Sequence, residues 1–122
     1  MGLSAGKRGM VTNPYIPKKG DFVTVTFDPQ SGHEQKGRRP AIVMSNYLFT
    51  KSTGLAIVCP ITSANRQFPF HVKIPGGQKI KGFIMVEQVK SIDYKTRKIR
   101  FLEKAPVDVL NKSLSILDAI IY

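Results

Sequence analysis

Short runs of β-branched and aromatic residues recur along most of this chain, and they constrain its fold more than any other feature. In the first run Phe22, Val23 and Val25 alternate in part with Thr24 and Thr26, a pattern typical of a strand. Residues that favour turns, mainly proline and glycine, separate one run from the next. The expected strands are 21–27, 41–45, 55–60, 68–74, 83–86, 89–94 and 98–102.

The end of the chain has a different period and predicts the only helix. Its apolar residues recur at intervals of three and four, which places them on one face of an amphipathic helix. Residues 46–54 are expected to be a polar connection. Short, regularly spaced strands favour a small barrel over a parallel sheet, so the fold class is mainly β, a curled antiparallel sheet with a C-terminal helix packed on it. The residues of the helical face are Val107, Leu110, Leu114, Leu117 and Ile121.

A chain of 122 residues has the size of one domain and is long enough to bury a core. Residues 1–14 are expected to be a flexible N-terminal leader, because the first nine are small, polar and basic and offer nothing to pack. Residues 15–122 are expected to form the single folded domain. The leader lacks the apolar stretch of a signal peptide, so the expected location is the cytoplasm.

The charge balance indicates the kind of partner. Nineteen lysines and arginines stand against eight acidic residues, which leaves a net charge of +11 and favours a polyanionic partner. A membrane is excluded as that partner, since no apolar run approaches the ~20 residues of a spanning helix. The expected helix also has too few lysines for a basic membrane-surface helix. Nucleic acid is therefore the expected partner.

The sequence offers no cluster of metal ligands, since His33 and His71 lie far apart and the eight acidic residues are scattered. It also lacks nucleotide-binding glycine motifs and the serine-hydrolase elbow, so we expect neither metal nor cofactor. Cys59, the single cysteine, is expected to be a small buried hydrophobic residue. A metal-free reaction fits RNA, because the 2′-hydroxyl is a built-in nucleophile that needs only a base, an acid and a cation.

Residues 27–41 form a polar loop between two expected strands, a usual place for catalytic residues. Arg39 is the candidate cation, because a guanidinium can hold two phosphate oxygens at once. The alternative is that it only binds the RNA backbone or pairs with an acid. Glu34 is either a general base or orienter of Arg39, or an ion-pair partner of the loop's cations. His33 is either an acid–base group or a solvated histidine.

Outside this loop the assignments stay open. A group of basic residues near the end of the expected sheet is either a track for phosphates or a solvated edge. Three aromatic residues in or beside loops either stack on unpaired bases or belong to the core. His71 alternates with Phe70 and Val72 on an expected strand and is interpreted as structural. The basic residues are Lys95, Arg97, Lys98 and Arg100, and the aromatic ones are Tyr47, Phe49 and Phe68.

One set of loop residues resembles the signature of the MazF/PemK family of toxin endoribonucleases. Residues 87–93 resemble a second block of that family, with Glu87 where an aspartate is common. The resemblance implies a small SH3-like (PemK/CcdB-like) barrel that works as a homodimer. It also implies metal-independent, sequence-specific cleavage of single-stranded RNA (mRNA), which leaves 2′,3′-cyclic phosphate and 5′-hydroxyl ends. The signature residues are Phe27, Asp28, Pro29, Gly32, Glu34, Gln35, Gly37, Arg39, Pro40, Ala41, Val43 and Ser45.

The same resemblance selects the site. Arg39 matches the catalytic arginine of the family, and Thr62, at the end of residues 59–62, matches its catalytic serine or threonine. Glu34 completes the expected catalytic set, although His33 has no family counterpart. The expected substrate-binding residues are Phe27, His33, Gln35, Lys36, Arg38, Gln67 and Phe68.

A cognate acidic antitoxin is the second implied partner, and the charge of +11 is an independent reason to expect one. The alternative function is a non-catalytic nucleic-acid-binding barrel, or a toxin of the same fold that poisons gyrase by protein contact. The combination of Glu34, Arg39 and Thr62 favours the nuclease, because a protein that only binds needs no such trio.

Overall fold

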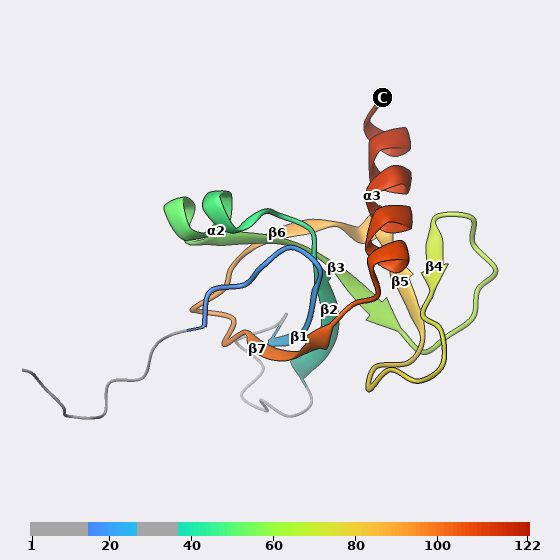
Figure 1. Ribbon diagram of the computed structural model, residues 1–122, viewed down its shortest axis with the longest axis horizontal. Coiled ribbons are helices and arrows are strands. Elements are labelled where there is room, and N and C mark those ends of the chain that lie inside the picture. The colour runs from blue at the N-terminus through green and yellow to red at the C-terminus, as the bar shows by residue number, and fades with distance from the viewer. Residues whose placement is uncertain (1–14, 27–36) are drawn as a thin grey trace, which may run out of the picture.

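The computed structural model describes residues 15–26 and 37–122, and the statements that follow concern these two ranges. In these ranges the strands form a curled sheet, and the helices lie beside it (Figure 1). The strands are β1 (Asp21–Thr26), β2 (Arg38–Val43), β3 (Leu55–Thr62), β4 (His71–Lys73), β5 (Phe83–Met85), β6 (Lys90–Asp93) and β7 (Arg100–Lys104). The helices are α2 (Tyr47–Thr53), the 3-10 turn η1 (Val86–Gln88) and α3 (Val107–Ile121).

The sheet is antiparallel throughout and has the order β4-β5-β3-β2-β1-β7, with β6 paired to β3 off this path. Strand β3 is its centre. One edge of β3 pairs with β2, while the other edge pairs with β6 over its first half and with β5 at Ile61 and Thr62. The predicted fold class is confirmed: the protein is mainly β, curled and antiparallel, with a helix at its C-terminal end.

Two apolar clusters fill the two faces of the curled sheet. One contains Phe22, Ile42 and Cys59 and is covered by α3, and the other contains Val23, Val43 and Tyr94. Strand alternation explains the division, because neighbouring residues of β1 and β2 point to opposite faces. Both faces of the central strands are therefore buried, which explains why their sequences are nearly continuous apolar runs.

Helix α3 covers the C-terminal stretch in which the sequence predicts a helix, but its buried face differs from the predicted one. Val109 and Ser113 are buried, and Leu110, Leu114 and Leu117 pack against the core beside them. Ser113 can be buried because its hydroxyl donates to the carbonyl oxygen of Val109 at 2.9 Å.

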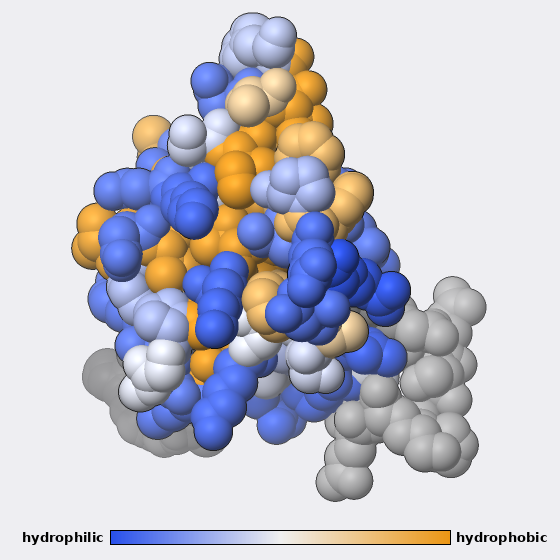
Figure 2. Space-filling view, turned by 90° about the vertical axis from the view of Figure 1, so that its right-hand side faces the viewer, coloured by the Kyte–Doolittle hydropathy of each residue, from blue (hydrophilic) through white to orange (hydrophobic). Residues whose placement is uncertain are grey.

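The two ends of the predicted face are wrong, since Val107 is 71% exposed and Ile121 is 64% exposed. Helix α3 projects from the sheet, and its C-terminal end extends beyond the other described elements (Figure 1). Apolar side chains consequently line the helix as an exposed band between hydrophilic surfaces (Figure 2). The apolar period therefore identifies the middle of the buried face correctly, but it does not show where along the helix the contact with the core begins and ends.

The predicted polar connection at residues 46–54 is wrong, because it contains α2. Asn46 caps the helix by accepting a hydrogen bond from the backbone N–H of Phe49 at 2.8 Å, and Gly54 ends it in the left-handed conformation. Several strand predictions are also corrected. Strand β2 covers Arg38–Val43 and not 41–45, so Arg39 lies on a strand and not in the predicted loop of residues 27–41. Strand β3 continues to Thr62, β4 begins only at His71, and β7 covers Arg100–Lys104, with Lys98 in a turn with φ of 53°. Within the described ranges, no helix has the length and apolar character that crossing a membrane requires.

Candidate active site

Arg39 and Thr62 lie at the same end of the β2–β3 ladder. Ala41 pairs with Pro60 in this antiparallel register. Arg39 precedes Ala41 by two residues and Thr62 follows Pro60 by two, so the register brings the two side chains to one place. The family resemblance predicted both residues, but only the strand register brings them together.

The two residues line one cavity of about 280 Å³. Pro60, Ile61 and Met85 contribute apolar lining, and Lys81 adds a second cation to Arg39. Arg39 is exposed and can therefore reach a bound anion. A cavity lined by an arginine, a lysine and a threonine hydroxyl suits a phosphate group. The residues around it are Arg39, Pro40, Pro60, Ile61, Thr62, Ser63, Lys81 and Met85.

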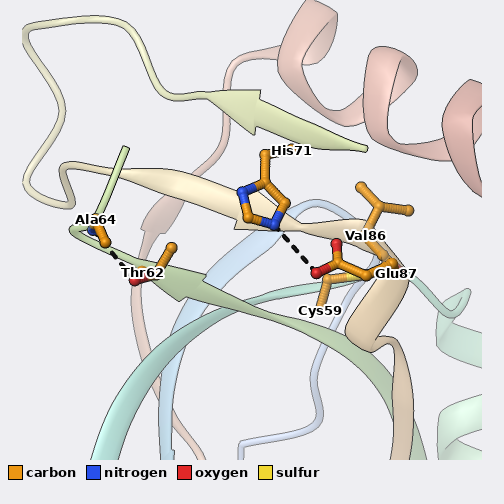
Figure 3. A network of polar contacts seen from close by, with 6 residues as sticks. All are labelled: Cys59, Thr62, Ala64, His71, Val86 and Glu87. Carbon is orange, nitrogen blue, oxygen red and sulfur yellow. Dashed lines mark hydrogen bonds and ion pairs between the residues drawn. The ribbon is translucent and has the colours of Figure 1, made fainter. Parts of the chain in front are cut away.

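The Thr62 hydroxyl is held in place by its own loop. Its Oγ1 accepts a hydrogen bond from the backbone N–H of Ala64 at 3.1 Å, as Figure 3 shows. Because Oγ1 accepts this bond, the hydroxyl hydrogen remains to donate to a substrate oxygen. Thr62 also pairs with Phe83 at the start of β5, which fixes the backbone on its other side.

Gly82 sets how closely β5 approaches Thr62. It has φ of +125°, and an added Cβ would lie 2.2 Å from the carbonyl oxygen of Thr62. Only glycine permits this approach, since the clash is with backbone and the conformation is one that other residues rarely adopt. Neither Gly82 nor Lys81 was predicted from the sequence, because a glycine and a lysine in a turn are common and do not indicate a contact with Thr62.

A second, larger cavity of about 530 Å³ adjoins the first and shares Thr62 and Met85 with it. Phe68 lines it and makes edge-on ring contacts with Phe70 and His71 at centroid distances of 5.4 and 5.1 Å. The predicted substrate-binding residue Phe68 thus lies beside the candidate site and is 41% exposed. The cavity is lined by Thr62, Arg66, Phe68, His71, Met85, Glu87 and Gln88.

His71 was interpreted as structural, and the structure shows a specific contact for it. Its Nε2 lies 3.1 Å from Oε2 of Glu87, and the histidine side chain is 4% exposed (Figure 3). The two residues are sixteen positions apart in the sequence, on β4 and η1, so no local pattern reveals the pair.

Arg38 is held by the fold and lines neither cavity as the described residues form them. Its guanidinium donates to the backbone oxygen of Thr24 at 3.0 Å and to that of Lys98 at 2.8 Å, and it also contacts the Thr24 and Thr26 hydroxyls. These bonds connect β1 and β2 to the turn before β7. The predicted role of Arg38 in substrate binding therefore competes with a structural one.

Gln67 lies on an exposed loop, with φ of 50° and its backbone N–H donating to Oδ1 of Asn65 at 3.0 Å. It is next to Phe68 but does not line the cavity that Phe68 lines. Its substrate-binding role stays a prediction. The other predicted site residues lie outside the described ranges: they are Phe27, His33, Glu34, Gln35 and Lys36.

Cys59 is buried beneath this region and is not available as a nucleophile. Burial raises the pKa of its thiol to about 12, and the nearby charge of Glu87 adds to the rise. A thiol with so high a pKa stays protonated at neutral pH and reacts slowly. Among the described residues no group of three or more metal-ligating side chains is close enough to hold an ion.

Comparison with known proteins gives one consistent family. Residues 18–121 match the model of the PemK-like, MazF-like toxins of type II toxin–antitoxin systems. The chain is 40% identical over 83 residues to the endoribonuclease toxin MazF of Escherichia coli K12, an alignment that covers 68% of this chain and 74% of that protein. It is 33% identical over 118 residues to endoribonuclease PemK of Escherichia coli, which covers 93% and 89% of the two chains.

Solved structures agree. MazF from Deinococcus radiodurans is similar with a TM-score of 0.80 and 37% identity, over 88% of this chain and 98% of that one. A MazE–MazF structure from the same organism is similar with a TM-score of 0.79 and 31% identity, over 88% and 97% of the chains.

Proposed function

This chain belongs to the PemK-like, MazF-like family of toxins of type II toxin–antitoxin systems, and on that premise we propose that it is a metal-independent, sequence-specific endoribonuclease that cuts single-stranded RNA. The observation that carries the proposal is the shared cavity of Arg39 and Thr62, with Lys81 beside them. The relatives are named endoribonucleases, and these are the two residues that match the family's catalytic pair.

The proposed reaction is a transesterification. The 2′-oxygen forms a bond to the adjacent phosphorus while the bond from phosphorus to the 5′-oxygen breaks. A base takes the 2′-proton, and an acid gives a proton to the departing 5′-oxygen. The products are a 2′,3′-cyclic phosphate and a 5′-hydroxyl, so no water is consumed and no metal is needed for balance.

Arg39 is assigned to the charge that develops on the phosphate. A guanidinium stays protonated, so its role is to stabilise charge and not to transfer a proton. The Thr62 hydroxyl, oriented through the Ala64 N–H, donates to a non-bridging oxygen or orients the 2′-hydroxyl. Glu34 is assigned as the base. It lies outside the described ranges, so this assignment rests on the family resemblance.

The chemistry is tested on a single-stranded oligonucleotide in excess EDTA. Arg39→Ala is expected to lower the cleavage rate on the order of 10²–10³-fold, the effect of removing a charge stabiliser. RNA affinity falls far less, because the other cations supply most of the phosphate attraction. Arg39→Lys keeps the positive charge but not the paired N–H donors of the guanidinium, so its cleavage rate is expected to lie between those of the wild type and Arg39→Ala. Lys112→Ala, an exposed cation on α3, is the control for loss of charge alone.

The results separate the alternatives. Equal losses of rate and affinity in Arg39→Ala would make Arg39 a binding residue only. Activity that is lost in EDTA and restored by magnesium would reject the metal-free reaction. RNA binding without cleavage in the wild type would favour the non-catalytic barrel. Glu34→Gln with an undiminished rate would move the base elsewhere.

The proposal extends to partners and location. The MazE–MazF structures similar to this chain support a cognate antitoxin here as well. We assign it an acidic segment, because the chain carries a net charge of +11. The family resemblance adds a homodimer and a cytoplasmic location.

A further inference from the structure

One buried polar atom lies at the candidate site without a partner. The His71 side chain is 4% exposed, and its Nε2 is engaged by Glu87. Its other ring nitrogen, Nδ1, has no hydrogen-bond partner, and it is the only buried side-chain nitrogen or oxygen in the described ranges for which this holds. Buried polar atoms in proteins are nearly always hydrogen-bonded, so this unpaired nitrogen, on a residue that lines the larger cavity, is a position at which a bound group can supply the missing partner.

The position of this nitrogen fits a ligand next to the scissile phosphate. In Figure 3 the ring of His71 has Nε2 toward Glu87, and Nδ1 lies on the side of Thr62 and Ala64. His71 and Thr62 both line the larger cavity, and Thr62 also lines the phosphate cavity with Arg39. A group bound at Nδ1 therefore occupies the cavity that shares Thr62 with the proposed reaction centre.

We propose that the larger cavity binds one nucleobase of the RNA beside the cut, and that His71 Nδ1 selects this base by accepting a hydrogen bond from its exocyclic amino group. The inference rests on the proposed function and deepens it. The cavity of about 530 Å³ is in the range of small-ligand sites. Phe68 and Met85 supply apolar surface for the ring of the base, and Gln88 supplies a further amide.

Glu87 determines which hydrogen bond the histidine can offer. The carboxylate accepts from Nε2–H, so in the neutral ring Nδ1 keeps a lone pair and can only accept. The amino groups meant here are N6 of adenine and N4 of cytosine, because guanine and uracil have the carbonyl oxygens O6 and O4 at the same positions. The N2 amino group of guanine lies on a different edge of its base. A carbonyl oxygen facing Nδ1 leaves two acceptors opposed and unpaired. Glu87 thus acts through His71 as a positioning residue.

A purely structural role for the pair predicts something different. To hold β4 against η1, only the Nε2–Glu87 bond is needed. Two substitutions separate the roles because each keeps one nitrogen position. The amide of His71→Gln reaches the Nε2 position and can pair with Glu87, while that of His71→Asn reaches the Nδ1 position and gives up Glu87.

The experiment first locates the base and then removes one atom group from it. A pool of random single-stranded RNA is cut by the wild-type protein and the 5′-hydroxyl ends are sequenced, which identifies the position that prefers adenine or cytosine. Oligonucleotides are then made with that base and with its analogue lacking the amino group. In the wild type, loss of the amino group is expected to lower kcat/KM about 10-fold, the worth of one hydrogen bond.

The substitutions give the decision. In His71→Gln the two oligonucleotides are expected to be cut at equal rates, and in His71→Asn the preference is expected to persist at least in part. The reverse order, with the preference kept in His71→Gln and lost in His71→Asn, would overturn the inference in favour of a structural pair. So would a wild type that discriminates against neither analogue.

Failure of the proposed function is a distinguishable result. If the wild-type protein cuts no RNA, the same paired oligonucleotides are compared by binding affinity. If the wild type binds the oligonucleotide with the amino group more tightly than its analogue, and His71→Gln binds both equally, the base site is supported even without cleavage. Equal affinities would overturn it.

Discussion

Replacing Gly82 by alanine tests how the fold positions Thr62. A Cβ at residue 82 would lie 2.2 Å from the Thr62 carbonyl oxygen, 3.0 Å from its carbonyl carbon and 3.3 Å from Cα of Ser63. All three are backbone atoms, so no side chain can rotate away. The added methyl therefore has to move the end of β3, where Thr62 faces the cavity.

Two effects of different size are expected. The positive φ of +125° is strained for alanine and costs about 1–3 kcal/mol of folding free energy. Relief of the contact at 2.2 Å requires a shift of about 1 Å to reach ordinary van der Waals separation. A displacement of about 1 Å of a group that positions substrate lowers the rate on the order of 10²-fold.

Gly77→Ala is the matched control. Gly77 also has a positive φ, +96°, but an added Cβ there meets nothing within 4 Å. It reproduces the backbone strain without moving Thr62, so it is expected to lose stability and keep most of its cleavage rate. Urea unfolding gives the free energy of each variant, and single-turnover cleavage well below the unfolding midpoint gives the rate.

The reasoning is refuted if Gly82→Ala is folded and cuts RNA at the wild-type rate, because the close approach to Thr62 would then not position the hydroxyl. Equal rate losses in the two alanine variants would also refute it. They would show that general destabilisation, and not displacement of Thr62, lowers the activity.

Three further predictions concern stability and partners. Tyr15 donates to the buried carboxylate of Asp21, and burial, then this contact, raises the tyrosine's pKa above its ordinary value. The contribution of the protonated hydroxyl to the free energy of unfolding is present below pH ~10 and is lost as the pH rises further. Tyr15→Phe should lower the free energy of unfolding by about 1 kcal/mol at pH 7 and reduce its decline at alkaline pH, measured by urea unfolding between pH 7 and 11. An acidic antitoxin peptide should compete with uncleavable RNA, and its association should slow as salt rises. Light scattering should give the mass of a homodimer at micromolar concentration. Simultaneous binding without mutual weakening, or a monomer at micromolar concentration, would count against the respective proposals.

The sequence predicts the strands well because their signal is local. The apolar residues Val23 and Val25 in one strand, and Ala41 and Val43 in the next, indicate buried positions whichever strand each one pairs with. Helix α2 was missed because Tyr47–Thr53 contains aromatic residues and threonines with weak helix propensity and no apolar period. Its two end signals, Asn46 and Gly54, were present and could have indicated it.

The candidate site shows the opposite case, since its geometry depends on pairings between distant segments. Arg39 and Thr62 meet only through the β2–β3 register, and sequence reasoning reached them through the family resemblance. His71 and Glu87 meet because β4 pairs with β5 and η1 follows β5 directly. A lone histidine on a strand carries no sign of such a partner, so the residues alone favoured a structural role.

The charges around the two cavities indicate that each cavity binds a different part of the RNA. The smaller cavity, as far as the described residues line it, has the cations Arg39 and Lys81 and no acid. The larger has Arg66 but also the carboxylate of Glu87, which would repel a phosphate placed beside it. A nucleobase has no net charge, so the same carboxylate is tolerated there and serves to orient His71. The phosphate is therefore expected beside Arg39 and the base beside His71, with Thr62 on the boundary that both cavities share.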